Sequence, residues 1–160
     1  ARASLANAIL YNAQLVEASL VNADLTRADL RGANLTQAIA HEALFTEADL
    51  NATDLTAASL FQANLSRADL SGANLEDVNL RQGYLTRTNL TGANLTGANL
   101  SDARIIRSVL DEANLTDAVL IGAKTDRTTF AGAIFCRTTM PDGTENNQDC
   151  PTESSSMSHL

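Results

Sequence analysis

The stretch ANLTGANLSD, residues 93–102, places leucine at every fifth position and a small residue two places before each leucine. The same spacing runs from Leu5 to Met140 without insertion or deletion, which makes 28 units. Another residue replaces leucine only at positions 40, 45, 105, 125, 130, 135 and 140. Repetition with one short period indicates a repeat architecture rather than an ordinary globular domain.

A period of five residues fits neither an α-helix nor a flat β-strand, whose periods are 3.6 and 2. In a helix the leucines would be spread around the whole cylinder, and Asn, Asp, Thr and Gly are poor helix formers. A turn in every unit satisfies the pattern, because the leucine and the small residue can then point inward. We therefore predict an all-β solenoid, in which each coil pairs with the coils before and after it.

The units Ala23-Asp24-Leu25-Thr26-Arg27, Ala33-Asn34-Leu35-Thr36-Gln37 and Ala93-Asn94-Leu95-Thr96-Gly97 match the consensus A(D/N)LXX. The sequence therefore resembles the pentapeptide-repeat family over residues 3 to about 140. The resemblance implies a right-handed quadrilateral β-helix with four pentapeptides per coil, hence about seven coils. At about 4.8 Å per coil the rod would be roughly 34 Å long. We expect residues 1–140 to form the rod and residues 141–160 to form a C-terminal cap and tail.

Two inward positions depart from leucine near the start of the rod. With four units per coil, residues twenty apart stack, so Ala40 leaves a gap between Leu20 and Leu60. We expect Phe45, on the next face, to fill part of this gap.

The repeat ends with bulky residues and a turn. Phe130, Phe135 and Met140 are expected to plug the C-terminal end, and Pro141-Asp142-Gly143 is typical of a turn. We expect a polar cap after this turn. A short helix would begin at Pro151 with Glu153 in its first turn, before a disordered Ser-rich end. The N-terminal end shows no cap in the sequence, so we expect either that a cap was lost upstream or that this end pairs with another chain. The rod is accordingly expected to be a monomer or an end-to-end dimer.

Cys136 and Cys150 are the two cysteines, separated by a polar segment of thirteen residues. Two buried free thiols are one interpretation. A disulfide is favoured, because little else would hold the segment in place; it would stabilise the fold by about 3 kcal/mol. Such a bond implies an oxidising compartment. Because no histidine clusters with the cysteines, we expect no zinc site.

Charge and hydropathy exclude several partners. The net charge of −8 argues against nonspecific binding to nucleic acid or anionic lipid. The sequence contains no run of 18 apolar residues, so we predict no membrane span. The chain contains no leader segment and starts at Ala1, so we expect that an upstream segment is removed.

Catalysis requires convergent titratable groups in a pocket. The only histidines, His41 and His159, have no partner at a fixed spacing, and His41 is expected to be a solvated surface residue. We predict no catalytic residue, no metal ligand and no cofactor, and therefore no enzymatic activity.

Every twentieth residue from position 27 is arginine, except Glu47. Seven of the eleven basic residues fall on one predicted side and are called here the basic strip: Arg27, Arg67, Arg87, Arg104, Arg107, Lys124 and Arg127. In one interpretation these cations pair with neighbouring carboxylates such as Glu47, Asp102 and Asp126. In the other, the strip binds an acidic partner or an anionic group.

Large apolar residues at outward positions are candidates for a second contact. Ile39 and Phe61 occupy the fourth predicted face, where polar residues are expected, together with Val21, Val119 and Ile121. Tyr84 is a single apolar residue on the face of the basic strip.

The end of the repeat, FCRTTMPDG at residues 135–143, resembles the ends of pentapeptide-repeat proteins from cyanobacteria and the thylakoid lumen. The resemblance implies an exported protein of the thylakoid lumen or periplasm. We therefore predict a non-catalytic interaction or scaffold rod with an unknown protein partner. An accessory domain of an enzyme is a further alternative.

Another alternative is a nucleic-acid mimic that binds a topoisomerase, as the quinolone-resistance members of the family do. Four of the 19 acidic residues lie beyond Met140, so the rod carries 15 acidic and 11 basic residues, a net charge of −4. Duplex DNA of the same length carries roughly 20 negative charges. The charge of the rod falls far short of this, and the basic strip would repel a surface that binds DNA.

Overall fold

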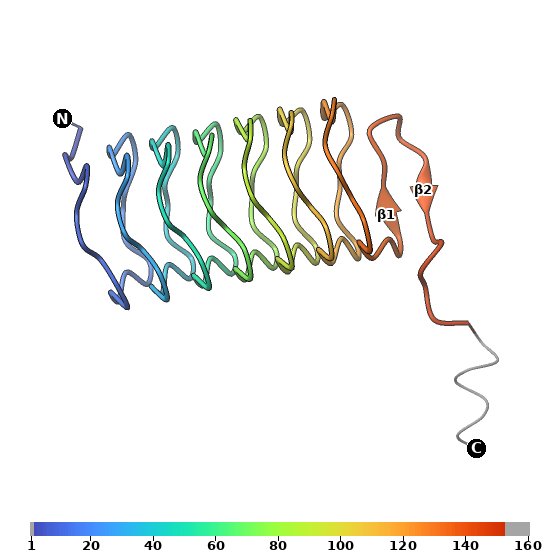
Figure 1. Cartoon of the computed structure of the whole chain (residues 1–160), viewed down its shortest axis with the longest axis horizontal. Coiled ribbons are helices and arrows are strands. Elements are labelled where there is room, and N and C mark those ends of the chain that lie inside the picture. The colour runs from blue at the N-terminus through green and yellow to red at the C-terminus, as the bar shows by residue number, and fades with distance from the viewer. Residues whose placement is uncertain (1, 153–160) are drawn as a thin grey trace, which may run out of the picture.

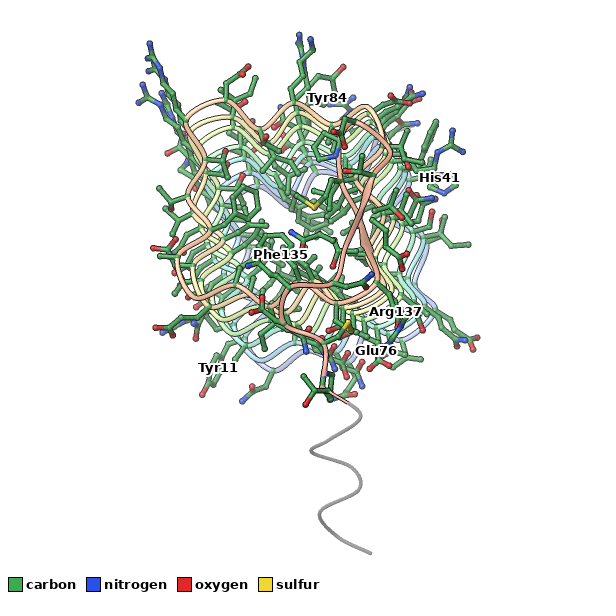
Figure 2. The ribbon with its side chains drawn as sticks, turned by 90° about the vertical axis from the view of Figure 1, so that its right-hand side faces the viewer. Tyr11, His41, Glu76, Tyr84, Phe135 and Arg137 are labelled. Carbon is green, nitrogen blue, oxygen red and sulfur yellow. A yellow bond between two sulfur atoms is a disulfide. The ribbon has the colours of Figure 1, made fainter. Side chains whose placement is uncertain are left out.

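The computed structural model describes residues 2–152, which wind into a rod with its two ends far apart (Figure 1). Isolated parallel bridges join the residue before each inward leucine to the residue 20 positions further on, as in Asp24 with Leu44 and Leu44 with Asn64. One coil therefore contains four pentapeptides. Figure 2 looks along the rod and shows the resulting four-sided outline.

Each pentapeptide ends in a turn that forms one corner of the coil. In the unit around Leu25, the Ala28 N–H donates to the Leu25 carbonyl (3.0 Å), and Arg27 between them has a φ of 58°. A positive φ at the third residue of a turn is the requirement of type II turns. The equivalent position has positive φ in every pentapeptide from Asn7 to Arg137, and most of these residues are not glycine.

The Asp or Asn of the consensus stabilises this turn from one side. The Asn34 Oδ1 accepts from both the backbone N–H (3.0 Å) and the hydroxyl (2.6 Å) of Thr36. Such an Asx turn provides an acceptor for the N–H of the residue after the leucine, which forms no backbone hydrogen bond with a neighbouring coil. Neighbouring coils are joined by backbone bonds, for example from Leu25 N–H to the Leu44 carbonyl (2.7 Å) and from Arg27 N–H to the Thr46 carbonyl (2.9 Å).

The core is a column of stacked leucines with alanines where two corners approach. Both kinds of inward residue are almost fully buried in the middle of the rod. Phe45 is fully buried and Ala40 is 1% exposed, so the Phe45 side chain points into the core. That it fills the gap left by Ala40 stays a prediction. A few inward positions carry a hydroxyl instead of a methyl group, and these hydroxyls donate to carbonyl oxygens 23 residues earlier in the chain.

The C-terminal end is closed as expected. Phe130 and Phe135 have ring centroids 5.8 Å apart, and Figure 2 places Phe135 inside the outline of the rod. Strand β1 (Thr138–Thr139) pairs antiparallel with β2 (Glu145–Asn146). The Phe135 N–H, which would bond to a further coil, donates instead to the Asp149 carboxylate (3.0 Å).

The predicted disulfide joins Cys136 and Cys150, with Cα atoms 4.7 Å apart. Pro151 and Thr152 adopt no helical conformation. Glu153 and the Ser-rich end, where the rest of the predicted helix and the predicted disorder fall, lie outside the described residues.

Candidate functional site

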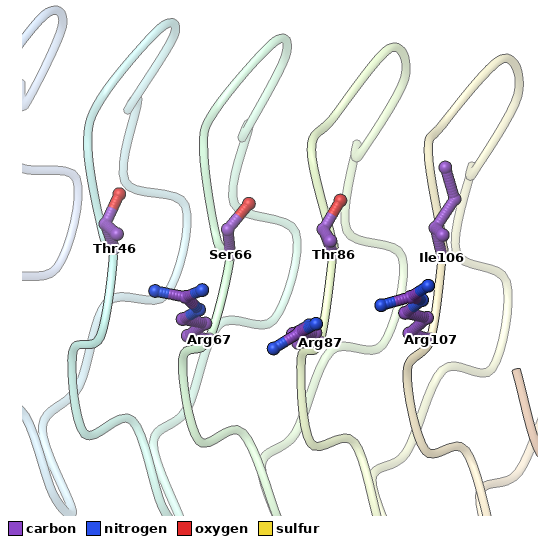
Figure 3. Close-up of a pocket in the computed structure, with 7 residues that line it drawn as sticks. All are labelled: Thr46, Ser66, Arg67, Thr86, Arg87, Ile106 and Arg107. Atoms are coloured by element: carbon purple, nitrogen blue, oxygen red, sulfur yellow. The ribbon is translucent and has the colours of Figure 1, made fainter.

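An open groove of about 630 Å³ runs along one corner of the rod (Figure 3). Seven residues line it: Thr46, Ser66, Arg67, Thr86, Arg87, Ile106 and Arg107. In Figure 3 the three arginines lie side by side, one in each of three successive coils, below the row that runs from Thr46 to Ile106.

The backbone fixes the spacing of the three arginines. Arg67, Arg87 and Arg107 occupy the left-handed position of their turns, with φ of 60°, 57° and 57°, and their side chains are exposed. Because equivalent residues of adjacent coils are about 4.8 Å apart, Arg67 and Arg107 are separated by about 10 Å along the axis.

No carboxylate of residues 2–152 lies within 4.0 Å of these guanidinium groups. The ion pairs of residues 2–152, with N–O distances up to 4.0 Å, involve only Arg31 and Arg137. The structure therefore contradicts the interpretation in which the basic strip pairs with Glu47, Asp102 and Asp126.

The acidic residues nearest in the chain are directed elsewhere. The Asp69 carboxylate accepts from the backbone N–H (2.9 Å) and the hydroxyl (2.6 Å) of Ser71, at the next corner. Asp49 likewise accepts from the Asn51 N–H (3.1 Å). Because it stabilises the following turn, Asp69 is not a counter-ion of Arg67, while Asn89 and Val109 take the equivalent positions after Arg87 and Arg107.

The other members of the basic strip lie outside the groove. Arg27 donates to the Asn7 side chain (3.1 Å). Arg104 and Lys124 belong to the bridged row before the corner, and Arg127 follows Arg107 in the arginine row. The structure thus brings three of the seven predicted residues together in one hollow.

The second row of the groove carries hydrogen-bond donors without acceptors. Leu44 and Tyr84 stand where many other pentapeptides have Asp or Asn, so they cannot accept from Thr46 and Thr86 as those side chains do. Within residues 2–152, neither the backbone N–H nor the hydroxyl of these two threonines has a partner. The Ile106 N–H also lacks an acceptor in this part of the chain, because Arg104 precedes it.

Ser66 is the exception in this row. Its N–H donates to the Asn64 side chain (3.0 Å), while its hydroxyl has no partner among the described residues. The sequence analysis did not identify Thr46, Ser66, Thr86 or Ile106. The signal that reveals the free N–H groups is the loss of Asp or Asn at positions 44, 84 and 104.

The predicted apolar contact is not a single patch. Ile39 and Tyr84 are 44% and 45% exposed, but Ile39 is bridged to Ser59 and Tyr84 to Arg104, in different rows. Phe61 is half-buried. Tyr84 thus lies in the row of Arg104 and apart from Ile39, which agrees with its predicted position on the face of the basic strip.

His41 was expected to be solvated and without a partner, and this expectation is wrong. Its Nε2 lies 2.6 Å from the Ser59 hydroxyl, and its ring meets Phe61 edge-on at 6.0 Å. Stacking explains both contacts, because Ser59 and Phe61 lie 18 and 20 residues further on, in the next coil. His159 lies outside the described residues.

Residues 2–152 contain no group of three side chains suited to hold a metal ion. The same part of the chain has no helix long and apolar enough to cross a bilayer.

The chain is similar to solved pentapeptide-repeat structures. QnrB1, a plasmid-mediated fluoroquinolone resistance protein, in a trypsin-treated form, is 18% identical over 82% of this chain and 72% of its own, with a TM-score of 0.54. This similarity concerns the fold alone. HetL from the cyanobacterium Nostoc sp. strain PCC 7120, involved in heterocyst differentiation regulation, is 26% identical over 90% of this chain and 87% of its own, with a TM-score of 0.37.

A pentapeptide-repeat protein from the Arabidopsis thaliana thylakoid lumen is 30% identical over 65% of this chain and 70% of its own, with a TM-score of 0.36. No curated protein sequence is significantly similar to the chain. The family model for pentapeptide repeats matches residues 1–38, 41–77, 73–111 and 113–142, in eight copies. These matches cover nearly the whole rod, and the chain therefore belongs to the pentapeptide-repeat family.

Proposed function

We propose that the chain is a non-catalytic interaction rod that binds a protein partner through the basic strip. The observation that carries the proposal is the stack of Arg67, Arg87 and Arg107, none of which has a carboxylate within 4.0 Å in the described residues. Like charges about 4.8 Å apart repel by about 1 kcal/mol in water, less with salt. An anionic group of a partner would remove this repulsion.

A non-catalytic role is supported by the chemistry of the groove. Its lining residues are three arginines, three hydroxyl residues and one isoleucine. None of them carries a carboxylate, imidazole or thiol that could act as a general base. The groove is also open to water, whereas catalysis favours a base within reach of an enclosed reacting group.

The proposal also includes the handedness of the rod, its number of coils and its cap. A right-handed quadrilateral β-helix of about seven coils over residues 1–140, with a cap over 141–160, agrees with the 20-residue register of the bridges. The hairpin of β1 and β2 joins the last coil to the cap.

An oxidising compartment, such as the thylakoid lumen or the periplasm, is supported by the Cys136–Cys150 disulfide. The alternative of a nucleic-acid mimic is disfavoured by the rod charge of −4 and by the unpaired arginines. The similarity to QnrB1 extends to the fold and adds nothing about a partner.

The test is a pull-down from an extract of the native compartment with two matched double variants. Arg87→Glu/Arg107→Glu reverses two charges in the groove. Arg2→Glu/Arg81→Glu reverses two exposed charges elsewhere that form no ion pair in residues 2–152. We expect the first variant to lose a partner that the wild type and the second variant retain. Equal capture by all three proteins would contradict a role for the strip.

A further inference from the structure

We propose that the groove binds a phosphoryl group, either as free phosphate or on a phosphorylated residue of a partner. The inference rests on the interaction role proposed above and names the chemical group that the groove recognises. It is carried by the kind, number and spacing of the donors that meet there.

Almost every polar group of the groove is a donor. Arg67, Arg87 and Arg107 each present five N–H groups and no acceptor. The N–H groups of Thr86 and Ile106 add two donors without partners in the described residues. The lining includes no carboxylate and no carboxamide, so the matching ligand is rich in acceptor oxygens and negatively charged.

The spacing of the arginines favours a tetrahedral anion. One guanidinium already satisfies both oxygens of a planar carboxylate by a bidentate contact. A phosphoryl group has three strongly accepting oxygens, so it can bind two guanidinium groups and a backbone N–H together. Arginines about 4.8 Å apart are close enough to approach one such group from two sides.

The ends of the groove limit the size of the ligand. Glu47 precedes Arg67 in the arginine row, and Asp126 follows Ile106 in the second row. Between these negative charges the run of free donors is about 10 Å long. Duplex DNA has one charge per about 1.7 Å and requires a continuous cationic surface, so a nucleic acid fits this short groove poorly.

The corners behind the groove are built differently from the others. The Ser108 hydroxyl accepts from Thr88 N–H (3.0 Å) and donates to the Leu85 carbonyl. One coil further, the Thr128 hydroxyl accepts from Ser108 N–H (3.2 Å) and donates to the Ile105 carbonyl (2.5 Å). The buried hydroxyl of Ser108 and the partly buried hydroxyl of Thr128 therefore support the turns that carry Arg87 and Arg107.

The test is a ¹H–¹⁵N NMR titration of the full chain at constant ionic strength. The probes are inorganic phosphate, a phosphoserine peptide with its unphosphorylated form, and citrate. The variant is Arg87→Gln/Arg107→Gln, and the control is Arg2→Gln/Arg81→Gln. Glutamine already occupies the same turn position at Gln62 and Gln82, with φ of 58° and 56°, so the variant should keep the backbone.

We expect phosphate to shift the Thr86 and Ile106 amide signals to saturation. The groove variant should lose at least about tenfold in affinity, equivalent to about 1.4 kcal/mol, while the control binds within about twofold of the wild type. Tighter binding of the phosphoserine peptide than of phosphate would assign the phosphoryl group to a partner, and equal or weaker binding would assign it to the free anion.

Three results would overturn the inference: no saturable shift at these amides, equal affinity of both variants, or citrate binding as tightly as phosphate. Failure of phosphate to bind while charge reversal still abolishes partner capture would leave the proposed function standing. Phosphate binding with unchanged capture would instead remove the strip from the proposed function.

Discussion

The backbone N–H of Thr88 donates a 3.0 Å hydrogen bond to the hydroxyl of Ser108, which lies one coil further along the rod. The same hydroxyl donates to the carbonyl of Leu85. It therefore bridges the two ends of the turn that presents Arg87 to the groove. In an ordinary corner the two ends meet directly, and the space of the hydroxyl is filled by an alanine methyl group.

Replacing this hydroxyl should weaken the fold without creating a cavity. Alanine is the common residue at this inward position, so Ser108→Ala fits sterically but leaves Thr88 N–H and the Leu85 carbonyl to form a new contact. We expect a loss of about 1–2 kcal/mol in the free energy of unfolding, measured by urea denaturation. Ser101→Ala removes a partly exposed hydroxyl bonded to Asn99 (2.7 Å) and should cost less than about 0.5 kcal/mol. Similar losses in both variants would show that the buried bridge has no special role.

The inward half of the molecule was predictable from the sequence because each inward residue depends only on the period. Phe45, at an inward position of the period, is fully buried. The stacking of residues that are 20 positions apart also predicted the row of arginines. The period does not predict which polar groups stay unpaired, because that depends on a residue in another row.

Thr46 and Thr36 illustrate this limit. Both are threonines at the same place in their pentapeptides, yet only Thr36 has an acceptor, because Asn34 precedes it and Leu44 precedes Thr46. The contact of His41 with Ser59 was missed for a similar reason: it joins two different positions of the repeat in adjacent coils. Side-chain contacts of this kind require the three-dimensional register as well as the motif.

The packing of Phe45 beside Ala40 predicts coupling between the two positions. Phe45→Leu should leave a cavity and cost about 1–2 kcal/mol, and Ala40→Leu should overpack the core and cost about 1–3 kcal/mol. The double variant restores leucine at both positions and should be more stable than the sum of the single losses predicts, by about 1 kcal/mol or more. Urea denaturation of the four proteins measures this difference. Additive losses would mean that Phe45 does not compensate for Ala40.

The disulfide should stabilise the rod by holding the cap across its last coil. Cys136→Ser/Cys150→Ser removes the bond and should lower the free energy of unfolding by about 3 kcal/mol, because the closed loop is short. Adding a reductant to the wild type should give a similar loss. The double variant itself should not respond to the reductant, which controls for its other effects on the protein. Unchanged stability of the variant would indicate that the cap is held by Asp149 and the β1–β2 hairpin alone.

Acid should weaken the rod through carboxylates that are hydrogen-bonded only in the folded state. The hydrogen bond from Arg137 (2.7 Å) lowers the pKa of the Asp117 carboxyl below its ordinary value. Because the folded-state pKa is lowered, the carboxylate contributes stability above the pKa of the unfolded chain, about 3.9, and this contribution is lost as the pH falls through the folded-state value. Asp117→Asn should therefore flatten the fall of the melting temperature between about pH 5 and pH 2.

Asp77→Asn provides the matched control for this titration. Asp77 occupies the same corner row two coils earlier, and no cation of residues 2–152 lies within 4.0 Å of its carboxylate. Its substitution should leave the fall of the melting temperature at acidic pH close to that of the wild type. Arg137→Gln should reproduce the flattening seen with Asp117→Asn, because either change removes the same hydrogen bond. If Asp117→Asn and Asp77→Asn gave the same acid profile, the Arg137 contact would not account for the pH dependence.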